Sequence, residues 1–148
     1  MSNVPQYSQS MEVEAPPEAI FAILDDVTRT PEWLKRCTKI EALSDGPIAV
    51  GQKMKYHYKD GSRTGVMDGE VAQHEPNRHL ENRFTDRMMA VSVDFRAEPL
   101  DAGRSRLTHT ITIDTKGIGK AFTPMIKRQL PDQTMGAMTS LKALAEGR

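Results

Sequence analysis

The chain has 148 residues, and its 20 Lys and Arg balance its 20 Asp and Glu to give a formal net charge of zero. This balance argues against a general electrostatic affinity for nucleic acid or for anionic membranes. The lone Cys37 excludes an internal disulfide and a cysteine-rich zinc site, and neither a secretory signal nor a long apolar run is visible. We therefore expect a cytoplasmic protein with one domain over 1–148 and an ordered core of about 7–146.

The first segments are predicted as a strand followed by two short helices. Apolar and polar residues alternate over 7–15, which is typical of a half-buried strand. The prolines at 16–17 end this strand and suit the first turn of a helix, where a missing N–H leaves no bond unmade. A second short turn follows around residues 30–34, with Trp33 as a packing anchor. The apolar stripe of the first helix consists of Ile20, Ile23, Leu24 and Val27.

Six further stretches alternate in the same way and are separated by short connections, most of them rich in turn-forming residues. Each stretch has one apolar and one polar face, which predicts an antiparallel meander with one side exposed to water. The stretches are residues 38–42, 53–59, 67–72, 80–84, 89–98 and 107–114.

The last part of the chain changes period to three and four, which predicts a long helix from about Lys120 to Glu146. Pro131 is expected to kink or break this helix. Gly65 and Gly69 favour a strongly curved sheet. The pattern as a whole predicts an α+β fold, in which a curved antiparallel sheet of about six or seven strands wraps around the C-terminal helix. A curved sheet cannot press flat against a straight helix, so we expect a cavity between them.

The inward-facing residues of the predicted strands and helix are the candidate ligand-binding residues. Nine methionines partly replace other apolar residues in this chain, and most of them, including Met11, Met135 and Met138, are placed on inner faces. Thioether side chains adapt to varied apolar partners, which favours a cavity, although ordinary core packing explains them as well. The candidates are Met54, Tyr56, Tyr58, Met67, Asn82, Phe84, Met89, Val91, Val93, Phe95, His109, Ile111, Phe122, Met125 and Ile126.

Some of these candidates are polar and allow two interpretations. His109 could present a nitrogen to a ligand carbonyl or act as an acid or base, and it is the candidate catalytic residue. The alternative for His109 is a satisfied core histidine or a strand register one residue away. Asn82 could hydrogen-bond a ligand or meet water at an edge or bulge. Tyr56 and Tyr58 could place their hydroxyls in the cavity or simply pack.

Other kinds of chemistry have no support in the sequence. No histidine, cysteine or carboxylate set has the spacing of a zinc site or a facial triad, so we expect no metal. No glycine-rich phosphate loop or serine nucleophile motif is present, so we also expect no cofactor.

Several short segments together carry a family resemblance, namely residues 13–21, Asp26, 31–33, Gly51, 69–71, 75–80 and 141–144. They are similar to the START-like (SRPBCC) superfamily, whose fold is known as the helix-grip fold. The resemblance is strongest to its polyketide cyclase/dehydrase and lipid-transport group and spans nearly the whole chain. It implies a deep, largely apolar cavity between sheet and C-terminal helix.

Three functions are compatible with these observations. The first is binding or transport of a hydrophobic small molecule, such as a lipid-like or polyketide-like compound, without catalysis. The second is a cyclase, aromatase or dehydratase that uses the same cavity, with His109 handling protons. The third is a protein-interaction module. We expect a hydrophobic small molecule as the partner, no nucleic acid, no stable membrane insertion, and a monomer or homodimer.

Overall fold

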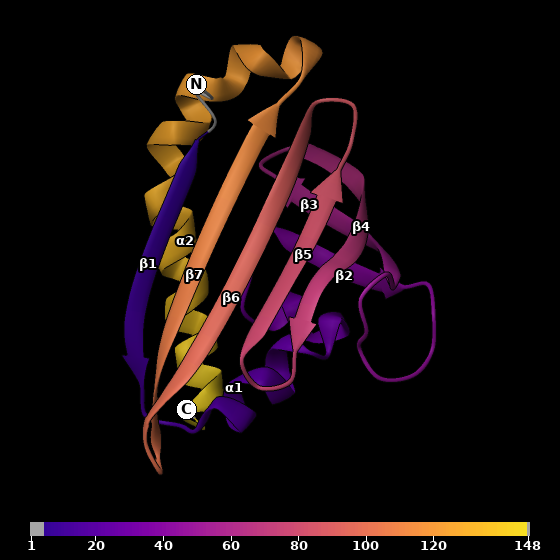
Figure 1. The fold of residues 1–148 in the computed structure, drawn as a ribbon. Coiled ribbons are helices and arrows are strands. Elements are labelled where there is room, and N and C mark those ends of the chain that lie inside the picture. The colour runs from indigo at the N-terminus through magenta and orange to yellow at the C-terminus, as the bar shows by residue number, and fades with distance from the viewer. Residues whose placement is uncertain (1–4, 148) are drawn as a thin grey trace.

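The computed structural model describes residues 5–147, which form a seven-stranded antiparallel sheet, two α-helices and two 3-10 helices (Figure 1). The elements in chain order are β1 (Gln6–Val13), α1 (Pro17–Leu24), η1 (Val27–Glu32), β2 (Cys37–Ala42), β3 (Lys53–Asp60), β4 (Arg63–Glu75), β5 (His79–Thr85), β6 (Met89–Asp101), β7 (Arg104–Thr115), η2 (Gly117–Phe122) and α2 (Thr123–Ala145).

The strand order across the sheet is β1-β7-β6-β5-β4-β3-β2, and all neighbouring strands are antiparallel. Strands β2 to β7 therefore form a meander, and β1 is added at the edge beside β7 (Figure 1). In that pair, Gln6 lies opposite Thr112. This arrangement confirms the predicted α+β architecture of a curved antiparallel sheet and a long C-terminal helix, with short helices after the first strand.

The sheet has one buried face and one exposed face, as the alternation predicts. On β7 the side chains of Leu107 and His109 are buried, whereas Arg104 and Arg106 are exposed. The core behind this face also includes Val13, Leu80 and Phe95 from other strands.

Gly69 in β4 lies between Met54 of β3 and Phe84 of β5 in the sheet register. A Cβ atom at this position would come within 2.7 Å of Met54 Cγ and 2.8 Å of Phe84 Cδ1. The glycine therefore lets two large side chains close over the backbone of β4, which is the close approach that a glycine inside a strand permits.

The helix α1 is shorter than its apolar stripe predicts. It begins at Pro17 and buries Ile20, Ile23 and Leu24 but ends at Leu24, so Val27 starts the separate 3-10 helix η1. The side chain of Asp26 accepts a hydrogen bond from the backbone N–H of Thr28 at 3.2 Å, which caps η1.

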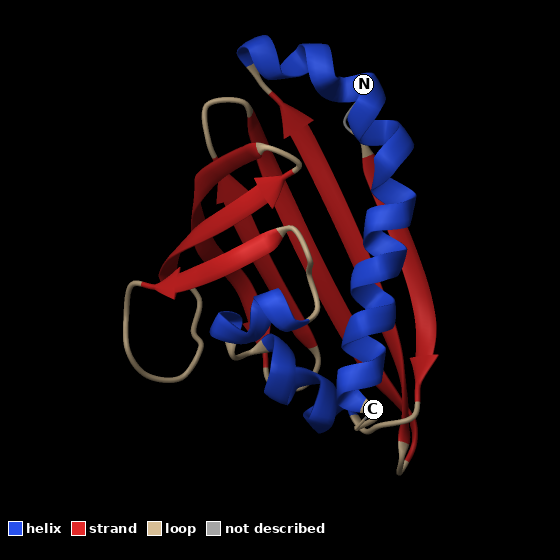
Figure 2. Cartoon of the chain, turned by 180° about the vertical axis from the view of Figure 1, so that it is seen from behind, coloured by secondary structure: helices blue, strands red, loops and turns tan. Residues whose placement is uncertain are grey.

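The helix α2 packs on β1, β7 and α1 (Figure 2). It starts at Thr123, three residues later than predicted, because the preceding turn is the 3-10 helix η2. Pro131 does not break it, since the helix is continuous from Thr123 to Ala145; Figure 2 shows a bend in its N-terminal part. The buried residues of α2 are Leu130, Thr134, Ala137, Met138 and Leu141. Within residues 5–147, no helix is long and apolar enough to cross a membrane.

Ser105 provides a polar tie between β7 and the segment that leaves β1. Its side chain is fully buried, and its Oγ donates a hydrogen bond to the carbonyl oxygen of Ala15 at 2.7 Å. We expect Ser105→Ala to lower the free energy of unfolding by about 1–2 kcal/mol, because it leaves a buried carbonyl without this donor. Urea denaturation measures this change.

The matched control is Ser10→Ala, which removes a hydroxyl that pairs with Thr108 Oγ1 on the exposed face. Its effect should stay within about 0.5 kcal/mol. An equal loss in both variants would contradict a special role for the buried bond.

Candidate ligand-binding cavity

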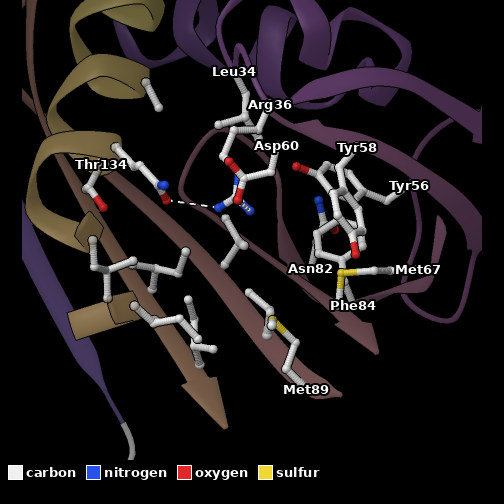
Figure 3. Close-up of a pocket in the computed structure, with 18 of the residues that line it drawn as sticks. Leu34, Arg36, Tyr56, Tyr58, Asp60, Met67, Asn82, Phe84, Met89 and Thr134 are labelled. Atoms are coloured by element: carbon white, nitrogen blue, oxygen red, sulfur yellow. Dashed lines mark hydrogen bonds and ion pairs between the residues drawn. The ribbon is translucent and has the colours of Figure 1, made fainter. Parts of the chain in front are cut away.

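A cavity of about 170 Å³ lies between the inner face of the sheet and α2. Most of its wall is apolar and comes from β3 to β7 and the first half of α2 (Figure 3). All but one of the predicted binding residues line it: Tyr56, Tyr58, Met67, Asn82, Phe84, Met89, Val91, Val93, Phe95, His109, Ile111, Phe122, Met125 and Ile126.

Two methionines occupy positions that the sequence did not predict. Met54 does not line the cavity, because its side chain packs against Gly69 in the core and is 3% exposed. Met135 is 44% exposed and does not line the cavity. Its sulfur instead accepts a hydrogen bond from Gln9 Nε2 of β1 at 3.3 Å.

The remaining lining residues were not among the predicted binding residues. Leu80 and Ile113 had the correct strand phase, and Trp33 was expected as an anchor, so their signals were present. Leu130 also lay in the apolar period of the long helix, whereas the polar lining residues from the loops and from α2 carried no such signal. The additional lining residues are Leu24, Thr30, Trp33, Leu34, Arg36, Asp60, Arg63, Leu80, Met88, Ile113, Gln129, Leu130, Gln133, Thr134 and Ala137.

His109 is held in a defined orientation in the cavity wall. Its ring stacks on Phe95 with centroids 4.3 Å apart, and its Nδ1 lies 3.1 Å from the backbone carbonyl oxygen of Asp94. A carbonyl only accepts, so Nδ1 carries the hydrogen and Nε2 of the neutral ring is an acceptor. Burial lowers the pKa of His109 to about 4, and the nearby Asp94 opposes this only in part. His109 is therefore a neutral hydrogen-bond acceptor at neutral pH.

Tyr56, Tyr58 and Phe84 form an aromatic part of the wall (Figure 3). The Tyr56 ring lies 6.1 Å from that of Tyr58 and 5.0 Å from that of Phe84, centroid to centroid. Gly65 makes room for Tyr58, because a Cβ there would come within 2.5 Å of the Tyr58 hydroxyl. Burial raises the pKa of Tyr56 well above its usual range, so its phenol stays protonated and can donate.

A polar bridge crosses one side of the cavity between the sheet and the helix (Figure 3). Arg36 Nη1 donates to Gln133 Oε1 of α2 at 2.9 Å, and Arg36 Nη2 lies 3.3 Å from Asp60 Oδ2 at the end of β3. The Arg36 Nε and the Asn82 Oδ1 are buried and have no hydrogen-bond partner within the described residues. The apolar wall therefore contains a few polar groups, the arrangement typical of sites that orient a small molecule.

Metal-binding groups do not gather in the part of the chain that the structure describes. Residues 5–147 hold no cluster of three or more His, Cys, Asp or Glu side chains arranged for a metal ion. Burial raises the pKa of the Cys37 thiol to about 11, so this side chain is a neutral thiol at physiological pH.

A family model described as "Polyketide cyclase / dehydrase and lipid transport" matches residues 5–146, almost the entire chain. The chain belongs to this family. Its membership agrees with the START-like architecture described above, in which a sheet and a C-terminal helix enclose the cavity. No curated protein sequence matches the chain.

Solved structures share the fold of this family member at low sequence identity. The Zhui aromatase/cyclase from Streptomyces sp. R1128 superposes with a TM-score of 0.81 at 18% identity, covering 97% of this chain and 94% of that one. A START superfamily protein from Mycobacterium smegmatis gives 0.77 at 18% identity, with 95% and 97% covered. A protein from Thermus thermophilus gives 0.77 at 12% identity, also with 95% and 97% covered. At these identities the likeness concerns the fold alone.

The low pKa of His109 makes stability depend on pH. Because the folded-state pKa of about 4 lies below the ordinary value of 6.5, the unfolded chain binds more protons between these two pH values. We expect the free energy of unfolding to fall by roughly 3 kcal/mol from this residue as pH drops from 7 to 4. Urea denaturation at a series of pH values measures the slope.

His109→Gln should remove this part of the pH dependence, whereas His57→Gln, a change on the exposed face of β3, should retain it. If His109→Gln shows the same dependence of unfolding free energy on pH as the wild type, His109 is not buried in its neutral form.

Proposed function

We propose that this protein binds a small hydrophobic molecule in the cavity between the sheet and α2. The observation that carries the proposal is an apolar cavity wall, built from five strands and the helix, that contains a few oriented polar groups. A folded chain ordinarily fills such a space with side chains, because voids lose contact energy. Membership of the family is in keeping with this function.

The lining of the cavity favours an apolar ligand with polar substituents. The neutral Nε2 of His109 suits a ligand hydroxyl, whereas the Tyr56 phenol suits a ligand carbonyl. An apolar ring system with hydroxyl or carbonyl groups, as in a polyketide-like compound, combines these properties.

A second candidate function is a cyclase, aromatase or dehydratase acting on a ligand of the same kind. The observation in its favour is that His109, with its Nδ1 fixed by the Asp94 carbonyl, lines the cavity. The low pKa of His109 favours the binding function over the enzymatic one, because a base with a pKa of about 4 accepts protons weakly at neutral pH. Incubation with a poly-carbonyl substrate separates the two functions. Turnover that His109→Gln abolishes, while ligand binding persists, would favour the enzyme.

Filling the cavity should abolish binding without unfolding the protein. We expect Val91→Phe and Met125→Trp each to weaken binding of a fluorescent naphthalene probe at least tenfold, because both side chains line the cavity. Met125 is 37% exposed, so a larger side chain there can be accommodated without disrupting the core. Fluorescence titration measures the probe affinity, and thermal unfolding reports whether each variant is folded.

Val66→Trp is the matched control, since Val66 is 49% exposed and lies on the opposite face of the sheet. It should leave the probe affinity unchanged. Native mass spectrometry of the purified protein gives an independent readout, namely an apolar compound retained by the wild type and lost from Val91→Phe. Unaltered affinity in both folded cavity variants would overturn the proposal.

A further inference from the structure

Three segments that are far apart in the sequence meet at the mouth of the cavity. These segments are the start of β4, the turn between β5 and β6, and η2 (Figure 1). The guanidinium of Arg63 lies 5.4 Å from the centroid of the Phe122 ring, and its Nη2 lies 4.0 Å from Met88 Sδ. The backbone N–H of Lys116 donates to the Met88 carbonyl at 2.7 Å. Because Arg63, Met88 and Phe122 also line the cavity, this surface is continuous with its opening.

The rim surface, which we define as Arg63, Arg87, Lys116, Ile118, Lys120 and Met125, presents apolar side chains to solvent. Ile118 is 76% exposed, more than any other large hydrophobic residue in the described chain, and Met125 is 37% exposed. Gly119 is buried against the Met88 carbonyl, where a Cβ would come within 2.1 Å of the oxygen. This close contact fixes η2 on the β5–β6 turn and holds Ile118 outward.

Basic residues surround Ile118. Lys116 lies two residues before Ile118 and Lys120 two residues after it, and both lysines are exposed. The sequence between Asp114 and Asp132 contains four basic residues and no acidic residue. The rim surface is therefore locally positive, although the whole chain is neutral.

Two of the acidic residues near the rim surface, Asp86 and Asp60, have partners of their own. Asp86 Oδ1 accepts hydrogen bonds from the backbone N–H groups of Met88 and Met89 at 2.7 and 2.9 Å, which shapes the β5–β6 turn. Asp60 pairs with Arg36 at 3.3 Å. By contrast, Arg63 and Arg87 form no ion pair with a carboxylate within the described residues, so their charges can interact with an external anion.

We propose that the rim surface docks the protein on an anionic lipid bilayer, with Ile118 and Met125 inserted at the headgroup boundary and the basic residues on lipid phosphates. Apolar side chains interleaved with basic ones fit an interface that is negatively charged at its surface and apolar beneath. A nucleic acid or an acidic protein surface would satisfy the charges but leave Ile118 without an apolar partner. Docking in this orientation places the cavity mouth against the membrane.

The test is sedimentation of the full chain with vesicles of phosphatidylcholine alone or of equal parts phosphatidylcholine and phosphatidylglycerol. We expect binding to the mixed vesicles, little binding to phosphatidylcholine, and loss of binding in 1 M salt, where the Debye length is about 3 Å. No cavity ligand is required, so a failure of docking and a failure of the proposed function are observed separately.

Two variants probe the two parts of the rim surface. Lys120→Glu should weaken vesicle binding at least about fivefold, since each basic residue near an anionic bilayer contributes about that factor. Ile118→Ser should weaken it about tenfold through the loss of inserted apolar area. Both residues are exposed, so circular dichroism and the thermal midpoint should stay at the wild-type values.

The controls are Lys39→Glu on β2 and Val50→Ser in the β2–β3 connection, both exposed and outside the rim surface. They should bind vesicles as the wild type does. Absence of binding to the mixed vesicles overturns the proposal. Equal losses in the controls, or a loss with Lys120→Glu and none with Ile118→Ser, also overturn it, since the last pattern indicates a polyanion or an acidic protein as the partner.

Discussion

A single helix cannot cover a curved seven-stranded sheet, and this mismatch of area governs the rest of the structure. The helix α2 packs on the β1 and β7 side of the sheet, whereas η1 packs on β2 at the other side. The middle strands therefore face a space that no backbone element fills. Side chains from β3 to β7 close this space only in part, and the cavity remains because their backbone positions are already set by the hydrogen-bonded ladder.

The strand residues of the cavity were predictable because side chains alternate between the two faces of a sheet. Once one residue of a strand is known to face inward, every second residue of that strand is known to do so too. Val91, Val93 and Phe95 on β6 are an example, since each of them lines the cavity. The helix was less predictable, because several nearby faces of a helix fit a loose apolar pattern. Met125 and Met135 were both placed inward, yet only Met125 lines the cavity, and Met135 instead contacts Gln9 of the edge strand β1.

Arg36, Asp60 and Gln133 were outside the reach of sequence reasoning for a different reason. They come from a loop, a strand end and a helix, and nothing in the local sequence relates one to another. Their contacts depend on how tightly the helix closes on the sheet, which is a property of the assembled fold. The same holds for Met54, whose inward phase was correct but whose depth depends on Gly69 in the next strand. The zero net charge likewise did not predict the positive rim surface, because a net charge gives no information on how charges are distributed over the surface.

The pairing of β1 with β7 has a consequence for how the chain reaches this structure. Gln6 and Thr112 are partners in the ladder, and their side chains, 106 positions apart, are linked by a hydrogen bond. During synthesis from the N-terminus, the first strand emerges long before its partner exists. Contacts at such large sequence separation are formed slowly, because a long loop has to close before they contribute. The meander from β2 to β7 can form from neighbouring segments, so we expect the pairing of β1 with β7, and with it the packing of α2 on β1, to come late in folding.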